Sequence, residues 1–362
     1  MKKIFLLSTG NYDFDGRLRE LYKVLDSICV VDGFMYKSKK GSPGENQKDL
    51  KPYTIVFFLY TYIHAFLKYI KTENINVLFV DNYFSAPIGW LLNLLFKPEK
   101  SVYDMRELYC GDSNYKLKTR LLIFFERRII NSFDVVIVAN NLRKNYLIEK
   151  YNINGKVLVF ENIRFLEPIR ESEQAEVETV KERLKLGKYN IIDTGGYSRA
   201  RGTHKLINEF LSIADKLDIS LTIVGGGRAE FENDYPNELL SVNFVDKVEL
   251  DTLRHILAIM DIGVVYYSFS DMNNKLCASG KVYEYIGFNM AVITSSHETL
   301  LEFCIKSKSG VSDDCYSNAI IRVLRSLDVY KHNAALYRNS YDVSNNSNVF
   351  KLDLIKALGF DL

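Results

Sequence analysis

The sequence predicts an α/β protein built from two doubly wound domains, each with a parallel sheet covered by helices on both faces. Short apolar runs of strand length alternate with longer segments of helical period. This alternation lapses once near the middle of the chain and then restarts. The chain also has 362 residues, more than the roughly 250–300 at which a single hydrophobic core stops growing.

The first half of the chain opens with an expected strand, Ile4–Thr9, and an expected helix, Leu18–Leu25. Three more strand and helix pairs and a last strand follow: Val77–Asp81 with Ile88–Phe96, Val102–Met105 with Leu117–Ile130, Val135–Ala139 with Leu142–Tyr151, and Val157–Glu161. Continuous apolar strands of this kind are typical of parallel sheets that are buried on both faces.

The alternation lapses over Arg164–Lys188, a segment rich in Glu, Lys and Arg that contains Pro168 and suits a linker leading into a surface helix. Strand and helix patterns then resume at Ile191–Gly195, Leu206–Ala214, Leu221–Val224, Val245–Leu250, Ile256–Met260, Ile262–Tyr267, Val282–Phe288, Ala291–Thr294 and Leu300–Ile305. We therefore expect domains at 1–165 and 190–328, a linker and surface helix at 166–189, and C-terminal helices at 329–362 that pack back on the first domain. Two such domains are expected to face each other across a cleft at the carboxyl ends of their strands.

Composition excludes several classes of protein. The net charge is +2, which gives no sign of a nucleic-acid binder that depends on phosphate neutralisation. The five cysteines are scattered without a Cys-x-x-Cys pair, so neither a disulfide framework nor a zinc site is indicated. The apolar run that opens the chain ends at Ser8, too early for a secretion signal. These features favour a reducing cytoplasm.

Two segments combine apolar and basic or aromatic residues. Ile55–Leu67 is the most apolar segment, yet it is shorter than the ~18 apolar residues that a membrane span needs. Lys116–Arg128 interleaves lysines and arginines with leucines and phenylalanines. Such segments suit peripheral contact with an anionic membrane surface, here the inner membrane, although core helices with solvated charged faces explain them equally well.

Three loops in the second half follow predicted strands and are suited to bind a diphosphate. The first, 194–202, contains three glycines and two arginines, among them Gly195, Gly196, Arg199 and Arg201. The second, 223–228, contains Gly225 and Gly226. Glycines let a backbone approach an anion closely, and arginines grip phosphate oxygens bidentately. Tight turns with solvated arginines are the plainer alternative for both loops.

The third loop enters a predicted helix with the sequence Ser-Gly-Lys-Val-Tyr-Glu from residue 279. Ser279 is expected to cap the helix, Lys281 to face an anion, and Glu284, one turn later, to accept hydrogen bonds from sugar hydroxyls. Helix chemistry alone offers an alternative, since a glutamate in the first turn gains ~0.3–1 kcal/mol from the macrodipole. Three such loops on successive strand ends favour a site for phosphate beside a polyol, which is what a nucleotide sugar presents.

The same loops carry a family resemblance. Gly-Gly-Tyr-Ser-Arg-Ala-Arg-Gly, then Val-Gly-Gly-Gly, then Lys-Val-Tyr-Glu-Tyr-Ile-Gly-Phe-Asn-Met resemble the carboxyl-terminal half of retaining GT-B glycosyltransferases of the family-four type, such as bacterial surface-polysaccharide enzymes. The resemblance covers 190–296 well and the whole chain weakly. It implies two Rossmann-like domains and transfer of a sugar, with retention, from a nucleotide sugar to a saccharide or lipid-linked saccharide. It also implies that neither a cofactor nor a metal ion is needed.

The resemblance assigns roles to particular residues. Arg199, Arg201 and Lys281 are expected to stabilise the leaving diphosphate and so to be catalytic. The expected donor-binding residues are Gly16, Gly195, Gly196, Gly225, Gly226, Ser279, Gly280 and Glu284. The expected acceptor-side residues are Asp15, Arg17, Asp104, Arg106 and Glu107. Asp13 and Asp15 also resemble a metal-binding Asp-x-Asp pair, but directly after a strand this spacing suits a turn.

Three positions depart from the family pattern. Leu276 stands where many members carry a first glutamate, Gly280 where they carry asparagine, and Arg106 where they carry histidine. These changes concern the sugar and the acceptor, whereas the nucleotide end with Arg201, Lys281 and Glu284 is retained. A nucleotide-sugar epimerase of the same fold and a catalytically degenerate nucleotide-binding subunit therefore stay open as alternatives. A Rossmann dehydrogenase is disfavoured because no Gly-x-Gly-x-x-Gly opens a helix after a strand.

Overall fold

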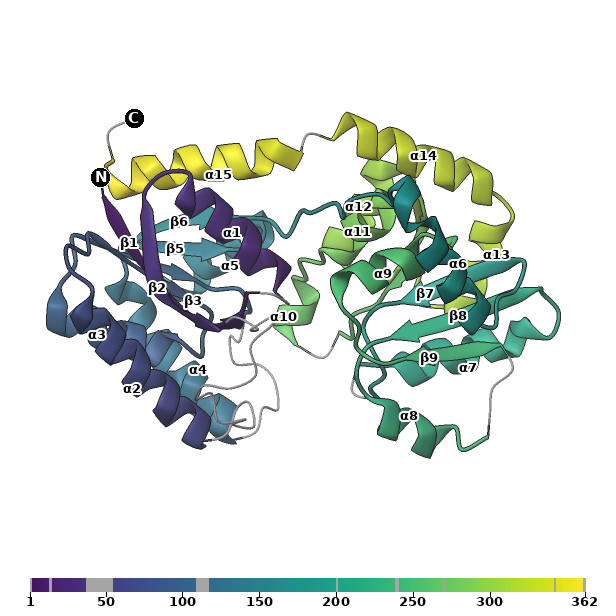
Figure 1. The fold of residues 1–362 in the computed structure, drawn as a ribbon, viewed down its shortest axis with the longest axis horizontal. Helices are drawn as coiled ribbons and strands as arrows, with labels where there is room; N and C mark the ends of the chain where they lie inside the picture. The colour runs from purple at the N-terminus through teal and green to yellow at the C-terminus, as the bar shows by residue number, and fades with distance from the viewer. Residues whose placement is uncertain are drawn as a thin grey trace. The chain divides into compact units, whose positions relative to one another are not determined.

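The computed structural model describes residues 2–12, 15–36, 55–108, 117–199, 201–237, 241–269, 271–341 and 343–360. The chain divides into two compact units. Unit 1 comprises residues 1–161 and 344–362, and unit 2 comprises residues 162–343. Figure 1 labels the helices and strands of both units.

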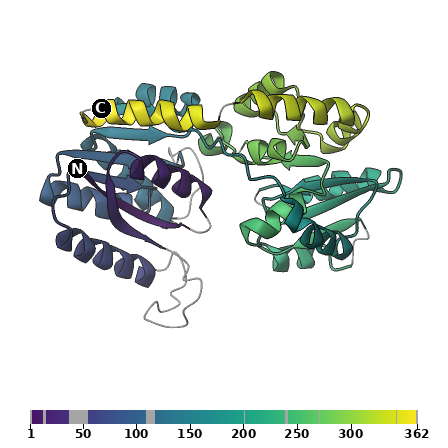
Figure 2. The same cartoon turned by 45° about the horizontal axis from the view of Figure 1, so that its top comes forward.

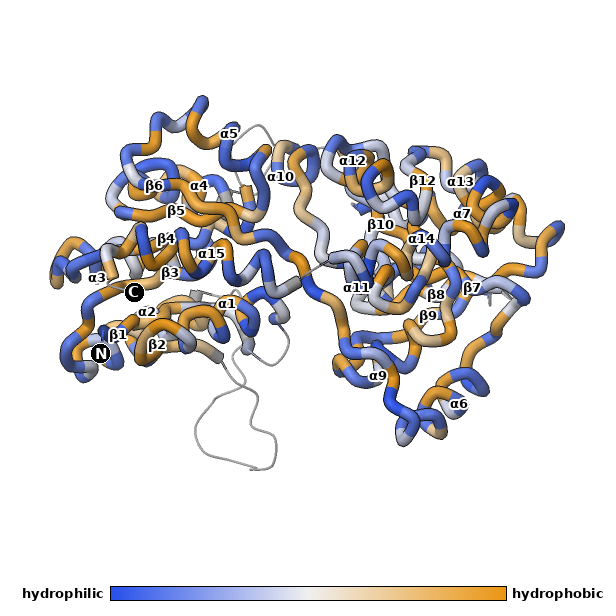
Figure 3. The backbone as a smooth tube through the Cα atoms, turned by 90° about the horizontal axis from the view of Figure 1, so that it is seen from above, coloured by the Kyte–Doolittle hydropathy of each residue, from blue (hydrophilic) through white to orange (hydrophobic). Residues whose placement is uncertain are grey.

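Unit 1 is built on a six-stranded sheet in the order β2-β1-β3-β4-β5-β6, and every neighbouring pair is parallel. Its strands are β1 (Lys3–Asn11), β2 (Val30–Tyr36), β3 (Val77–Asp81), β4 (Lys100–Asp104), β5 (Val135–Val138) and β6 (Lys156–Val159). All residues of β3 and β5 are buried, as expected for a parallel sheet covered on both faces. In Figure 3 the β5 segment is accordingly orange.

Helices cover both faces of this sheet (Figure 1). One face carries α1 (Gly16–Asp26) and α15 (Val343–Leu358), whose Phe350 and Leu354 join the same buried cluster as Ile4 and Leu18. Figure 2 shows α15 along unit 1. The other face carries α2 (Ile55–Lys71), α3 (Ala86–Phe96) and α4 (Leu117–Ile129), and the short helix η1 (Ile130–Ser132) and α5 (Asn141–Tyr151) complete the unit.

Unit 2 repeats the design with the strand order β12-β11-β10-β7-β8-β9, again parallel throughout. Its strands are β7 (Tyr189–Asp193), β8 (Ile219–Val224), β9 (Val242–Val245), β10 (Ile262–Val265), β11 (Ala291–Thr294) and β12 (Gly310–Ser312). The reversal of strand order between β7 and β10 makes the carboxyl ends of these strands the usual ligand position in such sheets.

Two buried clusters lie on the two faces of the second sheet. One contains side chains of α7 (Thr203–Ala214) and α13 (Tyr316–Leu324), and the other contains side chains of α9 (Leu250–Leu257), α11 (Lys281–Gly287), α12 (Glu298–Ser307) and α14 (Leu327–Ser340). The remaining helices of the unit are η2 (Glu171–Glu173), α6 (Gln174–Arg183), α8 (Arg228–Asp234) and α10 (Met272–Lys275). The doubly wound prediction is therefore confirmed for both halves of the chain.

Three strands differ from the sequence-based expectation, and one of them, β12, has only three residues and was not predicted. The sequence pattern did not predict β2, because Asp32 and Gly33 interrupt its apolar run. β9 occupies Val242–Val245, whereas the apolar pattern predicted an element at Val245–Leu250. Asn243 obscured the strand, since a buried asparagine is unfavourable without partners. Its side chain accepts a hydrogen bond from the Lys185 N–H at 2.8 Å and donates one to the Lys185 carbonyl at 2.9 Å.

The segment expected to be a linker, 166–189, lies within unit 2. Arg254 of α9 holds it by donating to the carbonyls of Glu167 and Pro168, each at 2.8 Å, and by pairing with Glu173 at 2.9 Å. The expected C-terminal helices are shared, because α14 belongs to unit 2 and nearly all of α15 to unit 1.

Within the part of the chain that the structure describes, no helix is long and apolar enough to cross a membrane. Cys29, Cys277, Cys304 and Cys315 are free thiols, and Cys110 lies outside the described residues.

Candidate functional site

The predicted loops of unit 2 all lie at the carboxyl edge of its sheet. The loop 194–202 follows β7, and residues 225–227 follow β8. Lys281 is the first residue of α11, which lies between β10 and β11. The sequence thus predicted correctly which strand ends carry these loops.

Close packing between two of the loops explains most of their glycines. The Gly196 N–H donates to the Val224 carbonyl at 2.9 Å, and the Tyr197 N–H donates to the Gly226 carbonyl at 2.8 Å. A Cβ at Gly196, where φ is +69°, would lie 2.5 Å from the Gly226 oxygen. A Cβ at Gly226 would meet nothing within 4 Å. Gly226 is therefore the glycine in these two loops that leaves open space beside the backbone.

Lys281 lies over the first of these loops. Its Nζ is 3.2 Å from Asp193 Oδ1, at the end of β7, and 29% of its side chain is exposed. A Cβ at Gly195 would lie 2.8 Å from this Nζ and 2.9 Å from Asp193 Oδ1. Burial by itself would lower the pKa of Lys281, but the Asp193 carboxylate outweighs it and raises the pKa above its usual range. Lys281 is thus a fixed positive charge at this edge.

The two arginines of the first loop have different partners. Arg201 is exposed and donates from Nη1 to the Gly195 carbonyl at 2.9 Å. The Nζ of Lys281 also lies beside Gly195, so both cations are close to this residue. Arg199 instead forms a bidentate pair with Asp234 of α8, with both N···O distances 2.5 Å, and 66% of its side chain is exposed. The structure therefore brings Arg201 and Lys281 to the same turn and directs Arg199 to a different helix.

Glu284 is buried beside a partner that the sequence did not predict. Arg164 donates to Glu284 Oε1 from Nε at 2.7 Å and also from Nη2. Only 4% of the Glu284 side chain is exposed, against 35% for Arg164. Both hydrogen bonds go to Oε1, so the second carboxylate oxygen, Oε2, takes no part in this ion pair.

The expected Ser279 cap is wrong. Gly280 occupies the N-cap position of α11 without a side-chain hydrogen bond, and the buried Ser279 hydroxyl has no hydrogen-bond partner among the residues that the structure describes. A buried hydroxyl without a partner is unfavourable, so a ligand atom that pairs with Ser279 would be stabilised. Gly280 packs closely, since a Cβ there would lie 2.9 Å from the Asn162 carbonyl oxygen. Leu276 occupies the C-cap of α10.

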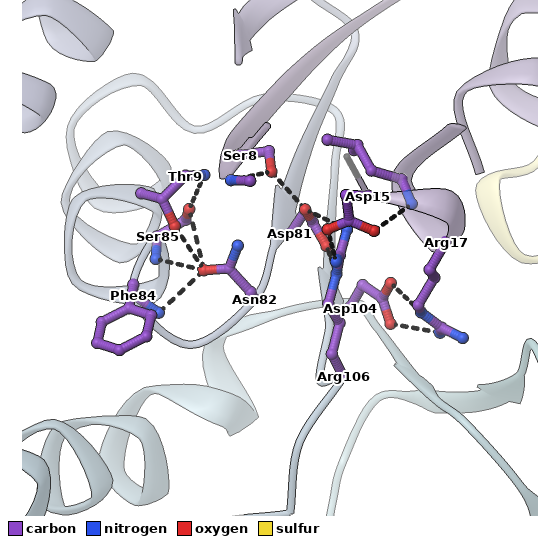
Figure 4. A network of polar contacts seen from close by, with 12 residues as sticks. Ser8, Thr9, Asp15, Arg17, Asp81, Asn82, Phe84, Ser85, Asp104 and Arg106 are labelled. Carbon is purple, nitrogen blue, oxygen red and sulfur yellow. Dashed lines mark hydrogen bonds and ion pairs between the residues drawn. The ribbon is translucent and has the colours of Figure 1, made fainter. Parts of the chain in front are cut away.

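Unit 1 has a charged network at the carboxyl edge of its own sheet (Figure 4). Arg106 pairs with Asp81 through Nε and, at 2.7 Å, through Nη2, and its Nη1 pairs with Asp15. Arg17 pairs with Asp104 at 2.8 and 3.1 Å. Four of the five residues expected on the acceptor side therefore lie in this network.

The network contains three carboxylates and two guanidinium groups, so its formal charge is −1 when all are ionised. Asp81 and Asp104 are fully buried. Burial raises the pKa of Asp81 to about 6, with Asp104 and Asp15 also raising it and Arg106 opposing them. For Asp15, burial acts in the same direction, but the Arg106 charge and the hydrogen bond from the Leu18 N–H lower its pKa overall.

The remaining residues of unit 1 with predicted roles lie around this network. Gly16 is buried at the start of α1, where Asp15 Oδ1 accepts from the Leu18 N–H at 3.0 Å. Glu107 is half exposed and its carboxylate lies 3.9 Å from Arg143, so it is separate from the Asp81 cluster. Asp13 lies outside the described residues. Within the described ranges, no three His, Cys, Asp or Glu side chains form a group that could hold a metal ion.

Sequence reasoning missed three charged partners: Asp81, Asp193 and Arg164. Asp81 ends a predicted strand, Val77–Asp81, so a rule that reads the last residue of every buried strand would have found it. Asp193 ends β7, but the predicted strand ran on to Gly195, so the same rule would have missed Asp193. Arg164 carried no such signal, because 120 residues separate it from Glu284.

Comparisons with known proteins agree on the fold. The similar solved structures include sucrose-phosphate synthase from Thermosynechococcus elongatus, with a TM-score of 0.67, 17% identity, and coverage of 99% of this chain and 96% of the other. They also include WaaG, a glycosyltransferase involved in lipopolysaccharide biosynthesis, with a TM-score of 0.72, 13% identity, and coverage of 98% and 99%. HepE from Anabaena, solved with UDP and glucose, has a TM-score of 0.64, 14% identity, and coverage of 98% and 100%.

UDP-N-acetylglucosamine 2-epimerase is similar as well, with a TM-score of 0.62, 11% identity, and coverage of 99% of this chain and 97% of the other. No family model matches the chain, and no curated protein matches it. At these identities the likeness shows the fold, two Rossmann-like domains of the GT-B type, which confirms the predicted fold class.

Proposed function

We propose that this protein is a glycosyltransferase that moves a sugar from a nucleotide-sugar donor to an acceptor, with retention of configuration and without a metal ion. The observation that carries the proposal is the placement of Lys281 and Glu284 one helical turn apart at the carboxyl edge of unit 2. A fixed ammonium there suits the diphosphate, and the buried carboxylate suits the ribose hydroxyls. HepE, which has the same fold, was solved with UDP-glucose.

In this proposal the leaving diphosphate is stabilised by Lys281 and Arg201. Negative charge builds on the diphosphate as the glycosidic bond breaks, so preorganised cations lower the energy of the transition state more than that of the ground state. Arg199 contributes less, because its guanidinium is already engaged with Asp234. Glu284 binds the ribose through Oε2, and Ser279 supplies a hydroxyl that lacks a partner.

On the acceptor side, we assign the binding of a saccharide or lipid-linked saccharide to unit 1. In the Asp81 and Arg106 network, Asp15 keeps 23% of its side chain exposed at the carboxyl edge of the sheet, where it can accept hydrogen bonds from hydroxyl groups of an acceptor. Arg17 positions this network, since its three guanidinium nitrogens donate to Asp104 and to the Phe160 carbonyl.

The acceptor requirement separates this proposal from an epimerase, whose solved structure has a similar fold. A panel of nucleotide sugars is first screened by thermal shift, since a ligand at 100 times its Kd stabilises the folded protein by ~2.7 kcal/mol. The stabilising donor is then incubated with saccharide and lipid-linked acceptors. We expect a glycosylated product whose yield depends on the acceptor. A donor that is epimerised without acceptor, or that binds without reacting with any acceptor, contradicts the proposal.

We also propose that unit 1 contacts a membrane surface peripherally. Exposed apolar side chains lie on all three helices of one face, including Val56 of α2, Leu94 of α3 and Phe124 of α4. Basic residues lie among them, which favours an anionic surface. Flotation with anionic liposomes tests this contact, and an absence of binding contradicts it.

A further inference from the structure

A groove on unit 1 is lined almost entirely by hydrocarbon. Its volume is about 480 Å³, and its lining comes from α2, α3 and α4, including Tyr62, Ile63, Trp90, Leu91 and Phe125. This volume falls within the roughly 300–1,000 Å³ of typical small-molecule sites. The one polar group of the Tyr62 side chain is satisfied elsewhere, since its hydroxyl donates to the Phe84 carbonyl at 2.7 Å. The groove therefore offers almost only apolar contact.

The groove remains open although its side chains are large and apolar. Ile63 is 56% exposed, Phe125 47% and Leu91 38%. Contiguous apolar surface of this kind on a water-soluble unit marks a binding surface for an apolar partner. A ligand that covers these side chains removes them from water.

The charge around the groove is strongly one-sided. Exposed basic residues on α2 and α4 are Lys68, Lys71, Arg120, Arg127 and Arg128. Of these, Lys68 pairs with Asp32 of β2 at 3.0 Å. In the sequences of α2, α3 and α4 the single acidic residue is Glu126, which is buried against the Tyr103 hydroxyl. The surroundings of the groove therefore attract a negatively charged group, such as a phosphate, that is attached to an apolar chain.

One end of the groove adjoins the charged network of unit 1. Tyr62 at that end bonds to Phe84, and Phe84 stacks on Phe58 with ring centroids 5.4 Å apart. The Phe84 N–H in turn donates to Asn82 Oδ1 at 3.1 Å, and Asn82 directly follows Asp81 (Figure 4). A chain lying in the groove can thus place its polar end at the carboxyl edge of the sheet.

From these four observations we propose that the groove between α2, α3 and α4 binds the hydrocarbon chain of a lipid-linked acceptor, with the phosphate of that lipid among the basic residues. The inference rests on the proposed transfer reaction and specifies its acceptor as a lipid phosphate or diphosphate that carries the sugar to be extended. A second copy of this chain is a poorer occupant, because a symmetric contact would bring the same basic residues of two copies together.

Trp90 provides a direct readout, because it lines the groove and is the single tryptophan of the chain. The full-length protein is titrated with octyl, decyl and dodecyl phosphate below their micelle concentrations while Trp90 emission is recorded. We expect saturable binding with a blue shift. Each added CH₂ group should tighten binding roughly fourfold, which follows from ~0.8 kcal/mol per buried methylene. Dodecyl maltoside, which lacks the charge, should bind at least tenfold more weakly than dodecyl phosphate.

Two variants of α2 form a matched pair. Ile63→Gln changes a residue that lines the groove and is 56% exposed, and Leu59→Gln makes the same kind of change at a residue that is 57% exposed and outside the lining. We expect Ile63→Gln to weaken dodecyl phosphate binding at least tenfold and Leu59→Gln to change it less than twofold. Equal losses in both variants, no saturable binding, or a concentration-dependent dimer that Ile63→Gln abolishes would each overturn the proposal.

Nucleotide binding is measured in the same samples to separate the two proposals. If nucleotide sugars bind and react but alkyl phosphates leave Trp90 unchanged, the groove proposal fails and the transferase proposal stands. If alkyl phosphates bind as expected but no nucleotide sugar does, the transferase proposal fails and the groove binds a lipid phosphate for another purpose, which overturns its assignment as an acceptor site.

Discussion

The two units have the same architecture, but their carboxyl edges use charge in opposite ways. In unit 1, Arg106 and Arg17 are held by buried carboxylates, and the side chains of Asp81 and Asp104 are fully inaccessible. In unit 2, Lys281 pairs with Asp193 but keeps 29% of its side chain exposed, and Arg201 is exposed as well. In unit 1 most of these charged side chains therefore pair with one another and hold the unit's own loops in place. Unit 2 instead presents cations that an anionic ligand can reach.

The pKa values show the same contrast. Burial is the largest cause that raises the pKa of both Asp81 and Glu126, and both belong to unit 1. In unit 2, Asp234 pairs with the exposed Arg199, and hydrogen bonds from Arg199 lower the pKa of Asp234 to about 2. Burial therefore governs the pKa of Asp81 and Glu126 in the first unit, and hydrogen bonding to arginine governs that of Asp234.

The largest expected effect is a loss of stability, which compares the buried pair of Arg106 and Asp81 with the pair of Asp234 and the exposed Arg199. Arg106→Ala leaves Asp81 buried without its cation, so we expect the free energy of unfolding to fall by ~3–5 kcal/mol. Arg199→Ala removes an equally bidentate pair, but its arginine is 66% exposed and the Tyr197 hydroxyl still donates to Asp234, so this change should cost no more than ~1 kcal/mol. Urea unfolding of both variants measures the difference, and similar losses would show that the two edges do not differ in this way.

Lys281→Ala tests whether the cations of unit 2 serve a ligand. Since a charge-assisted hydrogen bond contributes ~1.5–3 kcal/mol, we expect transfer to slow by roughly 100-fold, with the circular dichroism spectrum unchanged. Lys306→Ala, on α12, removes a lysine side chain that is 65% exposed and pairs with Glu302, and it should keep full activity. Arg201→Ala should fall between the two variants, and Arg199→Ala should be close to the control. A Lys281→Ala enzyme with normal turnover removes the diphosphate assignment.

Glu126 makes unit 1 sensitive to pH. Burial raises its pKa to about 7, whereas the unfolded chain ionises it near its ordinary value of about 4.5. Between pH ~4.5 and ~7 the folded state therefore binds one proton more than the unfolded state. The stabilisation from this proton is complete below pH ~4.5 and is lost as the pH rises through ~7. The free energy of unfolding should fall by at most about 3 kcal/mol over this range. Unfolding at pH 5 and pH 8 should show this loss, and Glu126→Gln should reduce it. An unchanged pH dependence in the variant would show that Glu126 is not the group responsible.

The smallest expected effect compares two glycines of unit 2. Gly195→Ala places a methyl group 2.8 Å from Lys281 Nζ, so the ammonium must move and transfer should slow by roughly tenfold. Gly226→Ala points into open space and should leave the rate within twofold. Equal rates for both variants would mean that the position of Lys281 over Gly195 has no bearing on turnover.

The sequence by itself determined the two-domain α/β organisation and most of its strands, because a parallel sheet covered on both faces requires continuous apolar runs wherever it is buried. It also determined which strand ends carry the glycines and basic residues, because chain order places each loop directly after its strand. The sequence did not predict β2 because Asp32 and Gly33 interrupt its apolar run. It did not predict β9 at its observed position because Lys185, the hydrogen-bond partner of the buried Asn243, lies 58 residues away.

Only the tertiary structure decided which charges meet. Nothing near Lys281 in the chain indicates Asp193, and nothing near Arg106 indicates Asp81, because long side chains find partners across neighbouring strands and not along the sequence. The same holds for the two arginines of the first loop. Arg201 donates to the Gly195 carbonyl, whereas Arg199, two residues earlier, pairs with Asp234 of α8. The sequence therefore fixes the kinds of charge at each edge, and folding decides whether a charge is neutralised by the protein or left for a ligand.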